Sequence, residues 1–506
     1  MNLITKTTKQ LAIWQSIILF FGFLATSYAQ TPFSNIIYPF RADPVIVQSG
    51  KNFHILYNNS GGHSIDSVTL KAEYWNVKLT LDSVQKGHFE YDMFTRQSTN
   101  NKIWVSVPAN APEEMYDLMV YAAGETFIAK RAVKVVKTFS DKHTFIHISD
   151  THVSRNWVGT ANNGYAKELE LLDRFISVAN IICPDFVVVT GDLIMNYTRF
   201  DADENGWGGT EVSSATAKPG VVEKYQSYFE GAKGFRGVQA IDAPVFSTTG
   251  NHDFYGVKED DYMAKSLQWN NYCGKRVFTF SYAGTRMLLS DNYLGDPVVD
   301  IPANATMSGY QGQLFEHFLK TNGEGKLIIM AQHNHTRFDT AFLNKHHIRL
   351  VLNGHNHAPL VKKIGTIPTL SIRPGVVCRS GEIKRWEEVL GFFRIFRVDG
   401  SDFKYSEPLR FCSNPADDYT KLDLNLTLNY KKNNTGRSTA NEATIKNKLP
   451  VNLPKCHVRF VMKKGTYKIE GGQLYQTVNT GALTILDVKA DVDACSTKTV
   501  KAIAVM

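Results

Sequence analysis

Short runs of alternating apolar and polar residues fill the chain from residue 31 to residue 139. The clearest runs are residues 52–57, 67–74, 103–107 and 118–122. Successive side chains of a strand point to opposite faces of a sheet, so this pattern predicts strands that bury one face. Regular short strands without helical periodicity favour an immunoglobulin-like β-sandwich over residues 30–140.

The rhythm changes between residues 142 and 398, where apolar runs alternate with segments of helical periodicity. The clearest helix-like segments are residues 165–182 and 311–319. Strands that alternate with helices are typical of a layered α/β domain, which is predicted for residues 141–400. Two interruptions, residues 197–237 and 296–309, are rich in Gly, Ser, Thr, Asn and Asp, and are predicted to be loops over a functional site.

The last part of the chain, residues 401–506, again has the pattern of a β-rich domain. Its predicted strands are residues 421–430, 457–463 and 482–490. A polar stretch at residues 431–448 is predicted to be an exposed loop. An α/β core with all-β domains on both sides fits a chain of 506 residues, which is too long for one ordinary core.

The first 29 residues have the layout of a secretory signal peptide. Lys6 and Lys9 precede an apolar stretch at residues 11–24, and Ser27-Tyr28-Ala29 places small residues where a signal peptidase cleaves. A retained membrane anchor is the alternative, but the apolar run is short for a spanning helix and no later stretch could cross a bilayer. We therefore expect a mature protein without a transmembrane span that is secreted, periplasmic or at the cell surface.

Charge and cysteine content change this picture little. The formal net charge is +8, or +6 without the two leader lysines, and it is spread without a dense basic block, so no nucleic-acid partner is predicted. The six cysteines form no Cys-x-x-Cys pair, which argues against a thiolate zinc site. Cys456 and Cys495 could form a disulfide, although spacing does not determine the pairing, and Cys183 is predicted to be a small buried apolar residue.

Candidate chemistry lies at the ends of five apolar runs in the central region. The motifs are Asp150-Thr151-His152, Gly191-Asp192, Gly250-Asn251-His252-Asp253, His333 and Gly354-His355-Asn356-His357. Ligands of α/β sheets bind beyond the carboxyl ends of the strands, so these five junctions are expected to meet in one cleft.

The spacing and types of these residues indicate metal ions. Residues i and i+2 of extended chain point the same way, so Asp150 and His152 can hold one ion, while His355 and His357 can divide between two. The glycines that precede the motifs allow sharp exits and close backbone approach. Imidazole, carboxylate and one amide oxygen together suit Mn, Zn or Fe rather than Ca.

The motifs, in this order, resemble those of the calcineurin-like metallophosphoesterase family. The resemblance covers residues 142–398, about half of the chain, and implies a four-layer α/β/β/α sandwich with two divalent or trivalent metal ions. It also implies roles for the site residues: Asp150, His152 and His357 on the first metal, Asn251, His333 and His355 on the second, Asp192 between both, and His252 beside the leaving group.

Residue 195 separates the chain from two branches of that family. Protein serine/threonine phosphatases carry Gly-Asp-x-x-Asp-Arg-Gly, whose second Asp orients the catalytic histidine, and purple acid phosphatases carry a tyrosine ligand at that position. Met195 can serve neither purpose, and Tyr197 lies two residues further on. The partner of the His252 ring is therefore open, with Asp253 as the candidate.

Two histidines compete within the fourth motif, Gln332-His333-Asn334-His335. His333 follows the apolar run directly, as in the His-His-Pro usual for the family, so it is favoured as the ligand. His335 and Arg337 are then candidates for contact with substrate.

The sequence thus predicts an exported phosphoesterase that uses a metal-bridging hydroxide on phosphomonoesters or phosphodiesters. Asn-His-Asp in the third motif, where protein phosphatases have Glu in place of the last Asp, favours small diesters slightly. The alternative is a cell-surface binding protein whose β domains recognise a ligand and whose metallophosphoesterase core is inactive. The seven ligands are all present, which argues against it. Metal identity, substrate and oligomeric state stay open.

Overall fold

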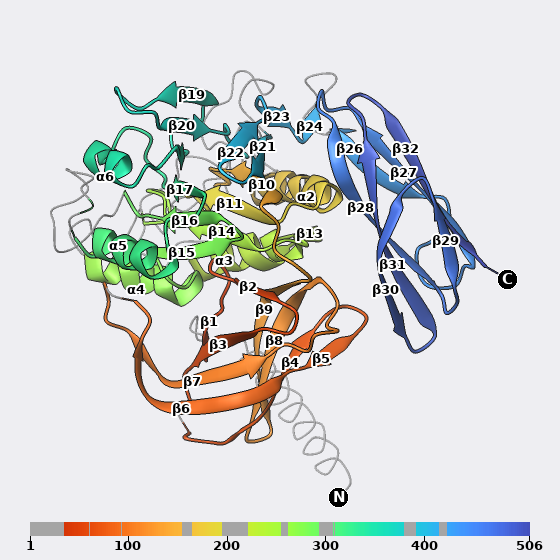
Figure 1. Ribbon diagram of the computed structural model, residues 1–506, viewed down its shortest axis with the longest axis horizontal. Coiled ribbons are helices and arrows are strands. Elements are labelled where there is room, and N and C mark those ends of the chain that lie inside the picture. Colours follow the sequence, from red (N-terminus) through yellow and green to blue (C-terminus); the bar gives the residue numbers. More distant parts are fainter. Residues whose placement is uncertain are drawn as a thin grey trace, which may run out of the picture.

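The computed structural model describes residues 35–59, 61–92, 94–153, 164–194, 221–254, 262–292, 307, 309–378, 391–413 and 423–505. The predicted signal peptide, Met195, Tyr197 and nearly all of the predicted loop at 296–309 lie outside these residues. An N-terminal β-sandwich, a central α/β domain and a C-terminal β-sandwich are distinct in Figure 1.

The N-terminal sandwich consists of two sheets, ordered β1-β3-β7-β6 and β2-β9-β8-β4-β5. The strands are β1 (Ile36–Tyr38), β2 (Val45–Gln48), β3 (Asn52–Tyr57), β4 (Ile65–Lys71), β5 (Asn76–Lys78), β6 (Thr80–Glu90), β7 (Ser98–Ser106), β8 (Glu114–Ala122) and β9 (Glu125–Val136). Alternate residues from both sheets, such as Ile55 and Ile103 from one and Leu118 and Val133 from the other, form its core.

The central domain is built on two further sheets, ordered β14-β11-β10-β21-β22 and β15-β16-β17-β18-β20-β19. The first sheet contains β10 (Lys142–Ile148), β11 (Phe186–Thr190), β14 (Val245–Thr248), β21 (Phe392–Asp399), β22 (Asp402–Tyr405) and β23 (Leu409–Arg410). The second contains β15 (Phe278–Tyr282), β16 (Thr285–Leu289), β17 (Leu327–Ala331), β18 (Leu350–Leu352), β19 (Leu360–Lys363) and β20 (Leu370–Arg373). Since β22 and β23 both pair with β21, the first sheet continues past residue 400.

Apolar residues fill both faces of these sheets. Phe145 and Val188 face the second sheet and pack with Ile329, whereas Ile146 and Val187, their neighbours in sequence, face outward. Strands buried on both faces consist of nearly continuous apolar residues, which is why the motif-bearing runs could be recognised in the sequence.

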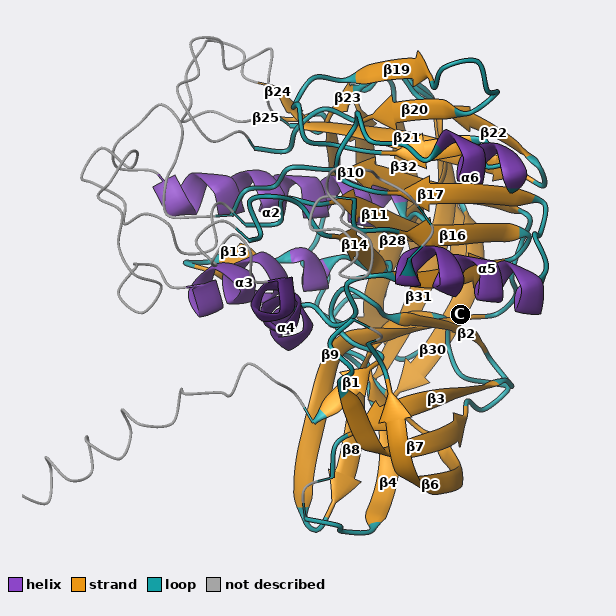
Figure 2. Cartoon of the chain, turned by 90° about the vertical axis from the view of Figure 1, so that its left-hand side faces the viewer, coloured by secondary structure: helices purple, strands orange, loops and turns teal. Residues whose placement is uncertain are grey.

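Helices cover the outer faces, and Figure 2 shows them on the two sides of the paired sheets. The helices are α2 (Gly164–Ile182), α3 (Val221–Glu230), α4 (Tyr262–Tyr272), α5 (Tyr310–Asn322) and α6 (Thr340–Lys345). Phe175 of α2 packs on the first sheet, and Phe315 of α5 and Phe342 of α6 pack on the second. This arrangement confirms the predicted four-layer α/β/β/α fold between strand-rich flanking regions.

The predicted loop at 197–237 is wrong over its described part. Residues 221–237 contain α3, the short strands β12 (Gly231–Ala232) and β13 (Phe235–Arg236), and the turn before the short helix η1 (Val238–Ala240). Tyr225, Tyr228 and Phe229 of α3 are buried in the core. The many polar residues before α3 concealed this apolar face.

The C-terminal sandwich has sheets ordered β26-β27-β32-β29 and β28-β31-β30, and a short pair, β24 (Cys412–Ser413) with β25 (Asp423–Leu424), precedes it. Its strands are β26 (Leu426–Tyr430), β27 (Ala440–Asn447), β28 (Leu453–Lys463), β29 (Tyr467–Glu470), β30 (Gln473–Thr480), β31 (Leu483–Val492) and β32 (Thr497–Ala504). The prediction of a loop over 431–448 is wrong for residues 440–447, which form β27 between two other strands, whereas residues 431–439 contain no helix or strand. Ala443 and Ile445 are buried between polar neighbours, so the strand has only a thin apolar face.

The described residues also show the state of the cysteines and whether any helix could span a membrane. Cys456 is buried, Cys495 is exposed, and no disulfide joins these two described residues, whose pairing the sequence left open. Cys183 lies just after α2 and is partly exposed rather than buried. Among the described helices, none has the length and apolar character needed to span a membrane.

A charged cluster centred on Arg459 connects the two β-sandwiches. Arg459 Nη2 lies 2.8 Å from Glu114 Oε2 of the N-terminal sandwich, and its Nε lies 2.7 Å from Asp487 Oδ1. His457 Nε2 contacts the same Asp487 oxygen at 2.9 Å, and Gln476 donates to the other at 3.0 Å. Burial alone would raise the pKa of Asp487, but the His457 hydrogen bond and the Arg459 charge lower it overall. Asp487 and Glu114 are both buried, so both depend on Arg459 for charge balance.

Replacing Arg459 with alanine should therefore destabilise the protein by about 3 kcal/mol, since two buried carboxylates lose their cation. Equilibrium urea unfolding of the variant should give a clearly lower midpoint. The control is Lys468→Ala, which removes an exposed pair with Glu470 and should change stability by no more than ~0.5 kcal/mol. Equal midpoints for the two variants would contradict a structural role for this cluster.

Candidate metal centre

The five motifs converge at one end of the central domain, but from two sheets rather than one. Parallel strands β10, β11 and β14 end at the first three motifs, and parallel strands β17 and β18 end at the other two. Because the two sheets are stacked, the carboxyl ends of both sets face a common space.

Backbone geometry at this end differs from the predicted extended form. Asp150, His152 and Asp192 have φ of 57°, 46° and 53°, and His355 and His357 have φ of 76° and 64°. These left-handed conformations are rarely populated by residues other than glycine and cost free energy. The expectation that i and i+2 face one way because the chain is extended is wrong. These five ligands are each directed into the site from a left-handed backbone position after the strand.

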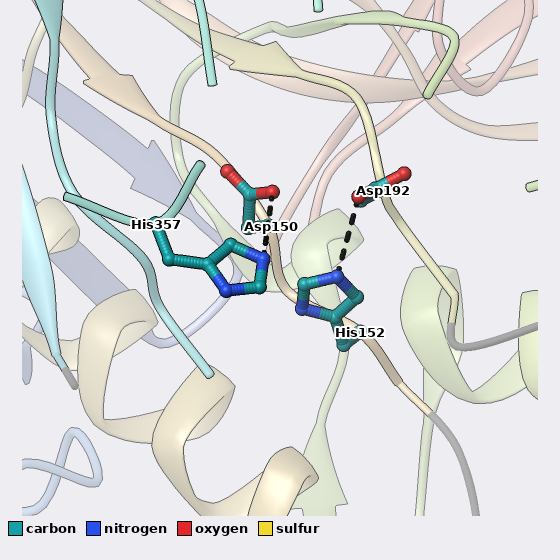
Figure 3. A group of neighbouring side chains, drawn as sticks. All are labelled: Asp150, His152, Asp192 and His357. Atoms are coloured by element: carbon teal, nitrogen blue, oxygen red, sulfur yellow. Dashed lines mark hydrogen bonds and ion pairs between the residues drawn. The ribbon is translucent and has the colours of Figure 1, made fainter. Parts of the chain in front are cut away.

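One group of ligands consists of Asp150, His152, Asp192 and His357, whose donor atoms all lie within 4.8 Å of one another. His152 Nε2 is 3.3 Å from Asp192 Oδ2, and His357 Nε2 is 3.5 Å from Asp150 Oδ1. Figure 3 shows these two rings and two carboxylates directed toward the same space. Three of the four side chains are buried and His357 is half-buried.

A second group consists of Asp192, His333 and His355. His333 Nε2 lies 3.2 Å from Asp192 Oδ2. The side-chain oxygen of Asn251 lies 3.0 Å from both His333 Nε2 and His355 Nδ1, so it belongs to the same group. Asp192 is common to both groups. The geometry therefore has two adjacent positions for cations with one carboxylate between them.

Backbone carbonyls orient two of the ligand rings. His152 Nδ1 lies 2.7 Å from the Cys378 carbonyl oxygen, and His333 Nδ1 lies 2.6 Å from that of Thr190. If each Nδ1 donates its proton there, each Nε2 lone pair is directed into the site, which is the usual arrangement around metal ligands. Sequence reasoning missed both contacts because a carbonyl oxygen belongs to every residue.

Electrostatics favours ionised carboxylates at the centre. Burial alone would raise the pKa of Asp192, but the charge of His333 and the neighbouring imidazoles hold it well below its usual value. In the same way, the pKa of Asp150 is lowered, against burial, by His357 and His333. Asp150 Oδ1 is buried and accepts no hydrogen bond from the described residues. A buried carboxylate oxygen in this state is suited to a cation.

His252 lies beside the first group. Its ring centroid is 4.9 Å from that of His152, and its backbone N–H donates to Asp192 Oδ1 at 2.8 Å. Burial lowers the pKa of its imidazole to about 3. The strand-end motif thus brings the predicted catalytic histidine to the edge of the metal centre.

Asp253 has a different role from the one predicted. Its Oδ1 accepts hydrogen bonds from the backbone N–H groups of Leu193 and Ile194, at 3.0 and 3.3 Å, and its Oδ2 accepts one from Gly250 at 2.8 Å. It is fully buried. All three hydrogen bonds go to backbone, so Asp253 joins the two loops that present Asp192 and Asn251 and is a positioning residue.

Of the two predicted substrate contacts, His335 and Arg337, His335 lies next to this centre. The His335 ring is 5.6 Å from the His355 ring between centroids, and His335 belongs to neither ligand group. Arg337 lies two residues further on and is half-buried. Arg373, at the carboxyl end of β20, was not predicted to be a site residue. Its place at the end of a largely apolar strand is a signal in the sequence that could have identified it.

Part of the chain is similar to known proteins. Residues 143–359 match the family model of the calcineurin-like phosphoesterases. Among solved structures, the chain is similar to PhoD, with a TM-score of 0.39 and 11% identity over 79% of this chain and 92% of that chain. TT1561 of Thermus thermophilus is similar with a TM-score of 0.31 and 11% identity over 53% of this chain and 99% of that chain. Zinc-bound Vps29 from Entamoeba histolytica is similar with a TM-score of 0.23 and 10% identity over 52% of this chain and 89% of that chain. No curated protein matches the chain in sequence.

Proposed function

We propose that this chain, in which residues 143–359 form a calcineurin-like phosphoesterase domain, is an exported phosphoesterase with two metal ions. One observation supports the second ion above all: the Asp192 carboxylate belongs to two ligand groups at once. A carboxylate that bridges two cations is the usual arrangement of two-metal hydrolases. The mixed nitrogen and oxygen donors suit Mn, Zn or Fe.

The residues of the chain have distinct tasks in this proposal. Two bound cations would neutralise charge on a phosphoester and acidify a water molecule. Asp150 and Asp192 supply the negative charge that balances them, and the imidazoles complete the two positions. His252, at the edge of the centre, can hold a phosphoryl oxygen or the leaving oxygen with a hydrogen bond from its neutral imidazole. Asp253 holds the loops that carry Asp192 and Asn251 together through its hydrogen bonds to their backbone.

Export is part of the proposal and is supported by the leader. Lys6, Lys9, the apolar stretch at residues 11–24 and Ser27-Tyr28-Ala29 have the order of a cleavable signal. N-terminal sequencing of the protein recovered outside the cytoplasm should begin at Gln30. A protein retained in membranes with an intact N-terminus would instead support an anchor.

An activity panel tests the function directly. The mature protein, loaded with Mn, Zn or Fe, is incubated with nitrophenyl monoesters and diesters, nucleotides and phospholipid headgroups. Hydrolysis of any of these esters supports a phosphoesterase, and the ratio of diester to monoester rates decides the bond type. No hydrolysis on the whole panel, despite two bound metals per chain, would favour the binding protein with an inactive core.

The choice of His333 over His335 has its own test. His333→Ala removes a ligand of the second group, so it should bind close to one metal ion per chain instead of two. His335→Ala lies outside both groups and should keep two ions. Metal content after dialysis, measured by elemental analysis, decides between them. Loss of an ion from the His335 variant alone would reverse the assignment.

A further inference from the structure

A pocket of about 420 Å³ adjoins the candidate metal centre at the β19–β20 edge of the second sheet. His335 lines it, and the His335 ring also lies 5.6 Å from the His355 ring between centroids. Because β20 is parallel to β18, its end at Arg373 lies at the same edge as the motif after β18. A molecule whose phosphoester lies at the metal centre can therefore extend into this pocket.

The pocket wall is cationic. Lys362, Lys363 and Arg373 line it, and no described lining residue is acidic. The two lysines are exposed and form the outer part of the wall, whereas Arg373 is only 6% exposed and forms the inner part. A concave wall with charge of one sign attracts and concentrates ligands of the opposite charge.

Arg373 is the most informative of these residues. Its Nη1 is buried without a hydrogen-bond partner among the described residues, as is Nδ1 of His335 on the same wall. Burial lowers the pKa of the Arg373 guanidinium, and the charge of Asp150 opposes this shift. Buried polar atoms without partners cost free energy and are rare in proteins, so a partner such as a ligand or a water molecule is expected at these two atoms.

The rest of the wall is apolar. Phe338, Leu360 and Ile364 line the pocket. Small-molecule sites commonly combine apolar walls with a few polar groups that fix orientation. The pocket thus has room for an organic group as well as for an anion.

We propose that this pocket binds a second anionic group of the substrate, a phosphate or a carboxylate, on the part of the molecule beyond the scissile phosphoester. The inference rests on the proposed phosphoesterase function and narrows its substrate class to molecules with two anionic groups joined by a short organic linker. Arg373 contacts the second anion, Lys362 and Lys363 attract it, and Phe338 and Leu360 contact the linker. A guanidinium is well suited to this task because its planar N–H groups match carboxylate and phosphate oxygens.

Competitive inhibition can measure whether the pocket binds a second anionic group. The probes are methylphosphonate, which has one anionic group, a series of α,ω-alkane bisphosphonates of increasing chain length, and 3-phosphonopropionate, which has a carboxylate as its second group. Hydrolysis of a nitrophenyl ester is the readout, and calorimetric binding to the metal-loaded protein is a second one. The best bisphosphonate should bind about tenfold or more tightly than methylphosphonate. Comparison with 3-phosphonopropionate shows whether phosphate or carboxylate is preferred.

Arg373→Gln should remove most of that advantage, so its affinity loss should be about tenfold larger for the bisphosphonate than for methylphosphonate. Because Arg373 is buried, Lys362→Gln provides a variant at an exposed position, with a smaller selective loss. Lys404→Gln, exposed on β22 and outside the pocket, is the charge-matched control and should keep the full advantage.

Two results would overturn the proposal. In one, no bisphosphonate binds more tightly than methylphosphonate to the unaltered protein. In the other, Arg373→Gln and Lys362→Gln weaken both inhibitor types equally. Failure of the proposed phosphoesterase function would give a different result. The unaltered protein would then not hydrolyse nitrophenyl esters, whereas calorimetry would still measure inhibitor binding in the pocket.

Discussion

Asp192→Asn is expected to lower turnover by at least about a thousandfold and to reduce metal content below two ions per chain. Asp192 Oδ2 lies 3.3 Å from His152 Nε2 and 3.2 Å from His333 Nε2, so this oxygen belongs to both ligand groups. An amide keeps the shape of the side chain but has no negative charge, and it places an N–H₂ group toward one of the two cation positions. Both positions should therefore bind their metal ions more weakly.

Turnover of a nitrophenyl ester and elemental analysis of the dialysed protein measure the two effects. Asp402→Asn, at a side chain that is 85% exposed on β22, makes the same chemical change away from the centre and should alter neither quantity. Normal activity with two metals retained in Asp192→Asn would refute the assignment of the bridging carboxylate.

The strands that present the site could be predicted because their composition follows from their burial. β11, Phe186–Thr190, is buried on both faces of a parallel sheet, so it appears in the sequence as a nearly continuous apolar run before Gly191-Asp192. Asp192 follows two residues later, and the exits of the other motif strands are equally abrupt. Apolar runs that end in Asp, His or Asn therefore predicted which residues gather at one end of the domain.

The local geometry of the ligands could not be predicted in this way. A φ of 57° at Asp150 or 76° at His355 is a consequence of contacts between loops from different strands, and the sequence of one loop does not contain them. The role of Asp253 is similar, because its three backbone donors come from two motifs. Its position beside His252 in the sequence suggested a side-chain contact that the fold replaces with backbone contacts.

Errors in the fold have a related cause. β27 was predicted to be a loop because only alternate positions such as Ala443 and Ile445 are apolar and buried, between polar residues that face outward. Its order depends on pairing with the preceding strand β26 and with β32, which is distant in sequence. A strand stabilised mainly by such pairing has little local signal.

Gly250→Ala is expected to disable the centre although it adds only one methyl group. A Cβ at Gly250 would lie 2.2 Å from the backbone nitrogen of Asp192 and 2.3 Å from its Oδ1. Backbone atoms cannot move aside cheaply, so the Asp192 and Asn251 loops must separate, and the hydrogen bond from Gly250 N–H to Asp253 Oδ2 must lengthen or break. Since a displacement of about 1 Å in a catalytic group can cost about a hundredfold in rate, turnover should fall by about that factor or more.

Metal content separates this effect from a general loss of folding. The Gly250 variant should lose metal while its circular dichroism spectrum stays close to that of the unaltered protein, because the strain is confined to two loops at the ends of β11 and β14. Gly465→Ala is the matched control, since its added Cβ would meet only Tyr467, at an ordinary contact distance of 3.5 Å. If Gly250→Ala bound two metals and turned over normally, the close packing of these loops would not be what holds the bridging carboxylate in place.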